Sequence, residues 1–294
     1  MTAGMMHSVT DRLMGTDVRV VGLPPALAAE AFTALRHAEQ VFSRFLPDSD
    51  TSRVNAGAGR PVRVSPLFAA ALQEACEHAA TTGGLFSPLL GAEVAATGYD
   101  VDFARVPGRA ARPLPPPSEP RVVIDHERGT VAIPYGVAVD LGGFVKGWAA
   151  QRVATDLRAR GVPRGLVDAG GDVVAWHEPG GTQWEVAIAA PGEGTITLSP
   201  YGAAATSSTA RRSWTGADGV RRHHVIDPRT GRPADSGCAQ ATVAAPDLAT
   251  AEVLATCMLV LGPGEGPRRL AERVSGWCTV DDSGRVRRGG GVRA

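Results

Sequence analysis

The hydrophobic and polar positions of the chain follow two periods, one typical of strands and one typical of helices. Residues 15–23 alternate apolar and polar side chains, which predicts a half-buried strand. Residues 25–45 then repeat apolar side chains at helical spacing. The residues on that helical stripe are Phe32, Leu35, Ala38, Phe42 and Phe45. A second helix is predicted to begin with Ser65 as its N-cap and Pro66 as its first residue, and to end at Gly83.

The second half of the chain mixes strand and helix patterns without a regular repeat. Two β-rich runs within residues 121–134 predict a hairpin, and residues 137–143 predict a short strand that breaks into glycines. A helix is expected from residue 144 to about 160. Residues 247–262 are apolar on nearly every side, which predicts a buried helix. Further strands are expected at 164–177, 183–191, 195–199 and 223–227, and a last helix at 264–276.

Strands interrupted by long helices, without βαβ alternation, indicate an α+β fold. We expect a single domain over residues 14–285, preceded by a flexible N-terminus at 1–13 and followed by a frayed tail at 286–294. Residues 104–120 contain six prolines and are predicted to form a surface insertion. The glycine motifs of dinucleotide-binding Rossmann domains and of P-loops do not occur.

The amino-acid composition limits the kinds of partner and location that are expected for this protein. Lys and Arg together number 30, as do Asp and Glu, so the formal net charge is zero and we expect no nucleic-acid partner. The four cysteines lack metal-ligand spacing and are expected to be reduced core residues. We find neither a signal-peptide pattern nor a run of 18 apolar residues, which predicts a cytoplasmic protein without stable membrane association. The oligomeric state stays open.

Residues 139–153 contain Lys146, the only lysine of the chain, whereas every other cationic position is arginine. Asp140 and the pair Gly142–Gly143 precede it. Glycines allow a ligand to approach the backbone, a helix N-terminus favours an anion, and an ammonium adds a compact positive charge. The alternative is an ordinary strand-to-helix turn with a capping aspartate and an exposed lysine.

Glu252 and Thr256 are four residues apart and therefore share one face of the predicted helix 247–262. A carboxylate in a buried helix requires a partner, and carboxylate, hydroxyl and carbonyl oxygens are the ligands of Mg²⁺. Alternatively, Glu252 only complements the helix dipole and Thr256 bonds its own backbone.

Three further segments carry groups suited to chemistry. His224, close to Asp227 and a glycine turn, could act as a base near neutral pH, or could be a surface histidine beside a turn. Gly170–Gly171 followed by Asp172 indicates a bulge or a close backbone approach. The hydroxyl cluster 206–208 could contact a ligand or cap a loop, and it lacks the surroundings of a hydrolase nucleophile.

Taken together and in order, several segments resemble the ApbE family of FAD:protein FMN transferases. The matching segments are MGT (14–16), FSRFLPDSDTSRVNA (42–56), GGLFSPLLG (83–91), VDLGGFVKGWAAQRV (139–153), GLVDAGGDV (165–173), ATSS (205–208), HHVIDPRTGRP (223–233) and ATAEVLATCMLVLG (249–262). They span most of the chain. The resemblance implies a T-fold-like α+β domain that transfers the FMN half of FAD to a Ser or Thr hydroxyl of a partner flavoprotein and releases AMP, with Mg²⁺ as cofactor.

The resemblance also implies roles for particular residues. It implies that FAD contacts Met14, Phe45, Leu85, Phe86, Ser87, Asp140, Lys146 and Val225. It places Mg²⁺ on the backbone of Gly143 together with Glu252 and Thr256, and it makes His224, with Lys146, the catalytic pair. The family usually has aspartate at the positions of Glu252 and Ser87, and tyrosine at that of Phe45.

Two other functions share the same predicted site. A Mg²⁺-dependent FAD pyrophosphatase would use water as the nucleophile and give FMN and AMP. A flavin-binding protein with a decayed metal site would bind without catalysis.

Overall fold

The computed structural model describes residues 7–114, 121–189 and 194–293. Its centre is a sheet of eight strands in which every neighbouring pair is antiparallel. The strand order is β1 (Ser8–Leu13), β2 (Thr16–Val21), β6 (Arg164–Ala169), β7 (Val173–His177), β10 (Tyr201–Ser208), β15 (Cys238–Ala245), β16 (Gly276–Asp281) and β17 (Val286–Gly290).

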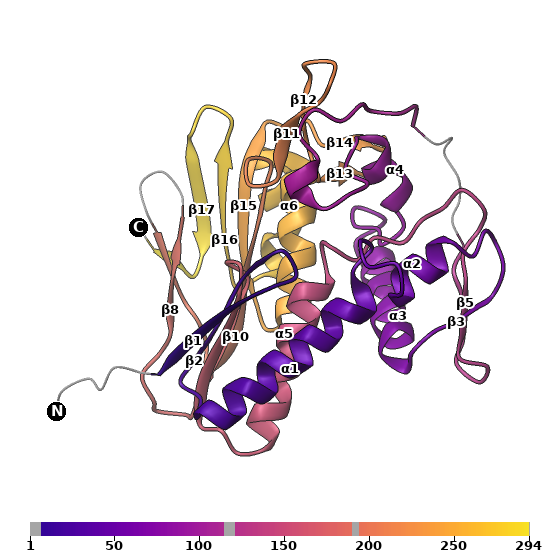
Figure 1. Ribbon diagram of the computed structural model, residues 1–294. Helices are drawn as coiled ribbons and strands as arrows, with labels where there is room; N and C mark the ends of the chain where they lie inside the picture. Colours follow the sequence, from indigo (N-terminus) through magenta and orange to yellow (C-terminus); the bar gives the residue numbers. More distant parts are fainter. Residues whose placement is uncertain (1–6, 115–120, 190–193, 294) are drawn as a thin grey trace.

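Helices cover one face of this sheet, with α1, α5 and α6 against the strands and α2 and α3 farther out (Figure 1). Their bounds are α1 (Pro25–Phe42), α2 (Asp50–Asn55), α3 (Pro66–Thr81), α4 (Gly91–Ala96), α5 (Val145–Ala159) and α6 (Leu248–Leu270). The periodicity predicted α1, α3, α5 and α6. The Ser65 hydroxyl accepts a hydrogen bond from Phe68 N, which confirms the predicted N-cap. The α+β fold class is likewise confirmed.

A small second sheet covers the opposite face of the main sheet. It consists of β8 (Glu185–Ile188), β9 (Gly194–Thr197) and β18 (Val292–Arg293). Because both faces are covered, β7 is buried along its whole length. Val174 and Trp176 point into the helical core, whereas Val173 and Ala175 pack beneath the small sheet. The two-residue period of a strand therefore fills two separate cores.

Short strands complete the structure around these layers. The predicted hairpin at 121–134 is present, and it joins a third strand in a small sheet of β3 (Val62–Arg63), β5 (Thr130–Ala132) and β4 (Val123–Asp125). Two further hairpins are β11 (Ser213–Thr215) with β12 (Arg221–His223), and β13 (Ile226–Asp227) with β14 (Arg232–Pro233). Single 3₁₀ turns lie at Phe103–Arg105 and Ala271–Arg273.

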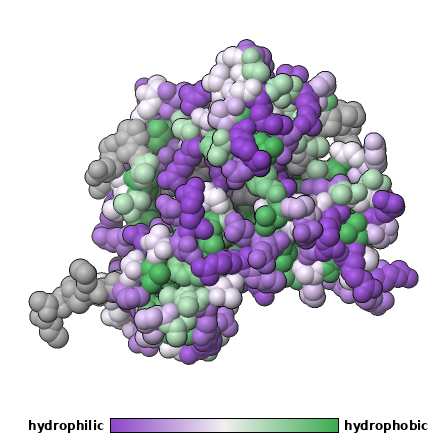
Figure 2. Space-filling view, in the orientation of Figure 1, coloured by the Kyte–Doolittle hydropathy of each residue, from purple (hydrophilic) through white to green (hydrophobic). Residues whose placement is uncertain are grey.

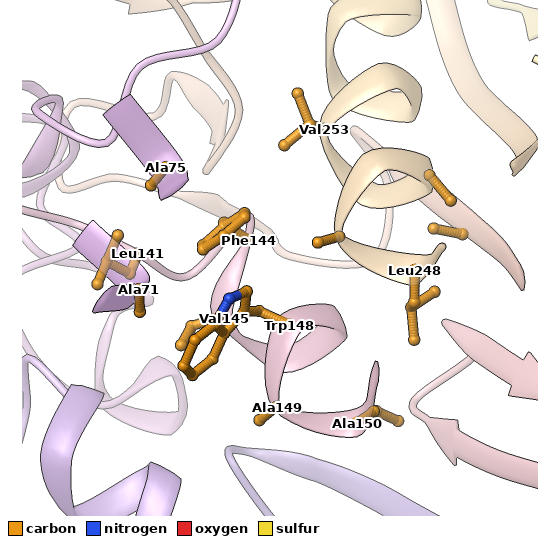
Figure 3. Packing of buried hydrophobic residues seen from close by; sticks show 14 of the residues in the cluster. Ala71, Ala75, Leu141, Phe144, Val145, Trp148, Ala149, Ala150, Leu248 and Val253 are labelled. Atoms are coloured by element: carbon orange, nitrogen blue, oxygen red, sulfur yellow. The ribbon is translucent and has the colours of Figure 1, made fainter. Parts of the chain in front are cut away.

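The contact between α5 and α6 brings the two halves of the helical layer together. Phe144 and Trp148 lie at the start of α5, with Leu141 and α3 on one side and α6 on the other (Figure 3). The ring centroids of Phe144 and Trp148 are 6.5 Å apart. A Cβ atom at Gly147 would lie 3.0 Å from the carbonyl oxygen of Leu248, so the glycine permits close approach of the two helices.

Helix α6 is buried in the core, as its all-round hydropathy predicted. Its length and composition would also suffice to cross a membrane, but 72% of its most apolar window is buried inside the protein. Gly262 has φ 90° and ψ 167° and interrupts the helical path between the two predicted helices. Only glycine fits there, because a Cβ atom would lie 2.7 Å from the Ser236 carbonyl oxygen.

Both chain ends differ from the prediction. Residues 8–13, expected to be flexible, form edge strand β1, which pairs with β2 over six residue pairs. Residues 286–293, expected to fray, form β17 and β18. The glycines of this tail concealed the strand pattern. A glycine is needed at position 289, because a Cβ atom there would lie 2.7 Å from the Trp277 indole nitrogen. Residues 1–6 and 294 lie outside the described part of the chain.

Two internal predictions also need correction. The helix expected over 25–45 ends at Phe42, which leaves Phe45 in a turn. Residues 137–143 form a loop, not a strand. In the described part of the proline-rich segment, 104–114, Val106 is fully buried and the backbone of Arg112 donates a hydrogen bond to Ala96, whereas the other residues except Arg109 are exposed. Residues 115–120 of that segment lie outside the described chain.

The α5–α6 contact predicts a steric difference between two helical glycines. Gly147→Ala should destabilise the fold by about 1–3 kcal/mol, because its Cβ would lie 2.6 Å from a Glu252 carboxylate oxygen and 3.0 Å from the Leu248 carbonyl oxygen. The control is Gly264→Ala in α6, where no atom lies within 4 Å of the added carbon. It should be neutral or stabilising by up to about 1 kcal/mol. Urea unfolding of both variants measures this, and equal stabilities would contradict the prediction.

Candidate active site

A cavity of about 910 Å³ opens between the end of α1, the start of α5, the β6–β7 turn and α6. Ligand sites commonly measure about 300–1,000 Å³, so this cavity is large enough for a dinucleotide. All twelve site residues predicted from the sequence line it. They are Met14, Phe45, Leu85, Phe86, Ser87, Asp140, Gly143, Lys146, His224, Val225, Glu252 and Thr256. The fold therefore brings these residues together, although their individual roles stay predictions.

The loop before α5 is held in place by side-chain hydrogen bonds where a strand was expected. Asn55 of α2 donates to the Val139 carbonyl oxygen at 2.9 Å and accepts from Val139 N at 2.7 Å, as a neighbouring strand would. The backbone of Asp140 donates to Pro88 at 2.9 Å. The Asp140 carboxylate accepts from Gly142 N at 2.8 Å, which fixes the turn that leads into α5.

Arg44, which the sequence reasoning missed, closes one side of the cavity. Its guanidinium lies 3.1 Å from the Asp140 carboxylate and donates to the Tyr99 carbonyl oxygen at 2.7 Å. It also lies 4.3 Å from the centroid of the Phe45 ring and 4.4 Å from that of Tyr99. Phe45 and Tyr99 thereby present a rigid aromatic wall to the cavity. The abundance of arginine in the chain concealed Arg44.

Lys146 lies in the first turn of α5 and joins three elements through its ammonium group. Nζ is 2.9 Å from a carboxylate oxygen of Asp172, beyond the end of β6, and 2.5 Å from one of Glu252 in α6. The other Glu252 oxygen accepts from Gly147 N at 2.9 Å. The Lys146 side chain is 15% exposed and the two acids are less exposed still. We name Lys146, Asp172 and Glu252 the ion cluster.

The charges of the ion cluster follow from its burial. Burial alone would lower the pKa of the Lys146 ammonium, but Asp172 and Glu252 outweigh it and raise that pKa above its ordinary value. Burial raises the pKa of the Glu252 carboxyl, against the opposing influence of Lys146. One ammonium therefore faces two buried acidic side chains, and burial disfavours the ionised form of Glu252.

Oxygen atoms gather around the ion cluster. The second carboxylate oxygen of Asp172 accepts from Thr206 N at 3.0 Å, and the hydroxyls of Ser207 and Thr256 lie 2.8 Å apart. The described residues contain no cluster of three or more His, Cys, Asp or Glu side chains. Two carboxyl groups with neighbouring hydroxyls nevertheless match the oxygen ligands that a hard cation such as Mg²⁺ takes. Asp172 was missed as a member of this set, and its position directly after Gly170–Gly171 was the available signal.

His224 lies at the cavity beside the buried Val225. Burial, with help from the charge of Arg212, lowers the pKa of His224 to about 3. Its ring atom Nδ1 is buried and has no hydrogen-bond partner among the described residues. The imidazole is therefore neutral at pH 7, able to accept a proton but weakly basic in this state.

The remaining predicted contacts lie on two loops. Met14 has φ 52°, and its backbone N–H donates to Glu39 at 2.7 Å, which fixes the β1–β2 turn at the cavity. Leu85 and Phe86 are buried after α3. The hydroxyl of Ser87 accepts from Leu89 N at 3.2 Å and so stabilises its own loop.

An α+β fold in which a large cavity contains a buried ion cluster and a neutral histidine is typical of an enzyme that acts on a large substrate. The sequence profile of the ApbE family matches residues 14–277, and this chain belongs to that family. The FAD:protein FMN transferase of Treponema pallidum is 32% identical over 285 residues, covering 87% of this chain and 79% of the relative. The one of Rhodobacter capsulatus is 31% identical, and this chain spans 53% of its length.

Solved structures agree with this assignment. The ApbE protein of Thermotoga maritima superposes with a TM-score of 0.81 at 26% identity, with 97% of each chain covered. The flavinyl transferase ApbE of Pseudomonas stutzeri has the same fold, with a TM-score of 0.78 at 24% identity over 96% of this chain and 92% of that one.

The buried charges of the ion cluster predict a large effect of removing the ammonium. Lys146→Met should destabilise the protein by about 3–5 kcal/mol at pH 7, because two buried carboxylates lose their counter-charge. The double variant Lys146→Met/Glu252→Gln should recover part of this loss. Urea unfolding of the single and double variants measures both effects. A Lys146→Met protein as stable as the wild type would show that the cluster contributes no stability.

The depressed pKa of His224 predicts a specific loss of stability in acid. Between about pH 6.5 and 3 the unfolded histidine binds a proton and the folded one does not, so stability falls as pH falls. His224→Asn removes this contribution. Between pH 7 and 5 the variant should therefore lose about 1–2 kcal/mol less of its free energy of unfolding than the wild type loses. Unfolding at both pH values tests this, with the exposed His126→Asn as control. Identical pH dependence in all three proteins would overturn it.

Proposed function

We propose that this chain is a Mg²⁺-dependent FAD:protein FMN transferase, which attaches the FMN half of FAD to a Ser or Thr hydroxyl of a partner flavoprotein and releases AMP. The observation that carries the proposal is the ion cluster, with its two acidic side chains, at a cavity large enough for FAD. Family membership and the names of the relatives support the same activity. A cytoplasmic location and a partner that is neither nucleic acid nor membrane stay predictions.

The proposed reaction is a phosphoryl transfer. The acceptor hydroxyl oxygen forms a bond to the phosphorus atom of the FMN half. The bond from that phosphorus to the bridging oxygen breaks, and its electron pair leaves with AMP. The hydroxyl proton passes to His224 and then to solvent. The nucleophile belongs to the partner, which explains why the protein needs no activated serine of its own.

Different residues of the cavity would serve different parts of this reaction. Asp172, Glu252, the Thr256 hydroxyl and the Gly143 backbone would hold Mg²⁺ beside the pyrophosphate. When bound, the metal would neutralise charge on the phosphate oxygens and on the leaving phosphate. Lys146 fixes the two acids relative to α5. Phe45 and Tyr99, braced by Arg44, offer a flat apolar surface for an aromatic ring of FAD.

His224 is suited to its proposed part through its neutral state. An imidazole that is unprotonated at pH 7 can accept the hydroxyl proton. A bound pyrophosphate would bring negative charge near the ring and raise its pKa, which strengthens the base when substrate is present.

The test uses an FMN-binding domain with a single Ser or Thr acceptor, co-expressed with the protein, and a matched acceptor with Ala at that position. We expect flavin fluorescence that stays on the first domain through denaturing electrophoresis, with an equal amount of AMP released when the purified pair receives FAD and Mg²⁺. Glu252→Gln should lower the rate by about 100-fold or more. AMP and free FMN without any acceptor would instead identify a pyrophosphatase, and retained flavin without product would identify a flavin-binding protein.

A further inference from the structure

Two consecutive arginines after β10 have so far been given no contact with a ligand. Arg211 and Arg212 lie in the connection between β10 and β11, and both line the cavity. They follow the hydroxyl cluster 206–208, and the sequence offered no reason to separate them from the many other arginines.

The other cationic side chains of the cavity already have acidic partners. Arg12 pairs with Asp17 at 3.3 Å, and Arg36 pairs with Asp11. Arg44 pairs with Asp140, and Lys146 with two acids, as described above. These groups therefore contribute little free positive charge to a ligand.

The arginine pair 211–212 differs, because neither guanidinium contacts a carboxylate among the described residues. Arg211 donates one hydrogen bond, 2.7 Å long, to the Gly170 carbonyl oxygen. The Arg212 guanidinium makes no hydrogen bond or ion pair within the same part of the chain. Guanidinium groups present several donors in one plane, which suits the oxygens of phosphates.

The position of the pair fits a ligand that spans the cavity. Arg211 lies over the β6–β7 turn, where a Cβ atom at Gly171 would be 3.0 Å from its Nη1. Asp172 of the ion cluster is the next residue. On the other side, a Cβ atom at Gly15 would be 3.6 Å from Arg212 Nη2, at the β1–β2 turn that carries Met14. The pair thus connects the predicted flavin contact with the neighbourhood of the ion cluster.

Electrostatics favours such a group. The pyrophosphate of FAD carries negative charge, and the ion cluster presents two acidic side chains to it. A metal ion would reduce this repulsion, but the phosphate oxygens that face away from it still need donors.

We propose that Arg211 and Arg212 bind the pyrophosphate of FAD and position it beside the ion cluster. This inference rests on the proposed function. It adds a binding role for a segment that the predicted contacts do not include. It also explains Gly171, because a side chain there would obstruct Arg211.

The test compares ligands that contain a diphosphate with one that contains none. FAD, ADP and riboflavin are titrated into the wild type, Arg211→Met and Arg212→Met, with Mg²⁺ present. We expect each variant to bind FAD and ADP about 10- to 100-fold more weakly and to bind riboflavin as the wild type does. The control is Arg221→Met in β12, on the hairpin that follows the arginine pair. Arg221 lies outside the cavity and contacts Ser213, so this variant should bind all three ligands normally.

The possible failures are distinguishable. Unchanged FAD and ADP affinity in both variants, or an equal loss for riboflavin, would overturn the role of the arginine pair while the wild type still binds FAD. A wild type that binds neither FAD nor riboflavin would instead contradict the proposed function. If the wild type then still binds ADP and the variants do not, the arginine pair remains a phosphate site. If the wild type does not bind ADP either, the phosphate site is overturned as well. Circular dichroism confirms that each variant is folded.

Discussion

The ammonium of Lys146 between two buried carboxylates is the interaction on which the site depends. It connects α5 to α6 and to the end of β6, three elements that are distant in sequence. Buried carboxylates without a counter-charge are costly, so the ammonium makes it possible to keep Asp172 and Glu252 in the core. The glycine at position 147 allows the helices to approach closely enough for the Glu252 carboxylate to accept from its backbone as well. Packing and charge therefore constrain the same point of the fold.

This arrangement divides the cavity by charge. The ion cluster contributes two acidic side chains, whereas Arg211 and Arg212 contribute guanidinium groups without an acidic partner among the described residues, on the loop beside it. A ligand with a pyrophosphate and a metal ion would satisfy both regions together. His224 lies within the influence of Arg212, so a phosphate on that arginine would also relieve one cause of its depressed pKa. Phosphate binding at Arg212 would then raise the basicity of His224.

The sequence was informative where local chemistry determines structure. Helical periodicity and the Ser65 cap predicted the helices, and the segments shared with the ApbE family placed twelve residues that do line one cavity. Pairings across the fold were not predictable in this way. Asp172 and Arg44 meet their partners only through tertiary packing, and arginine is too common in this chain to attract notice. The strand β17 was missed because its glycines hide the strand pattern. The reason for Gly289 is the Trp277 ring beside it, which belongs to a different strand.

The position of the only lysine can now be explained by the geometry. The two carboxylate oxygens that Lys146 contacts belong to different elements and converge on one atom, at 2.9 and 2.5 Å. An ammonium directs three donors outward from a single nitrogen and can serve both acids at once. A guanidinium is planar and wider, and its donors suit two oxygens of one group better than two groups that converge on a point. Arginine at this position would have to push α5 away from α6, against the contact that Gly147 permits.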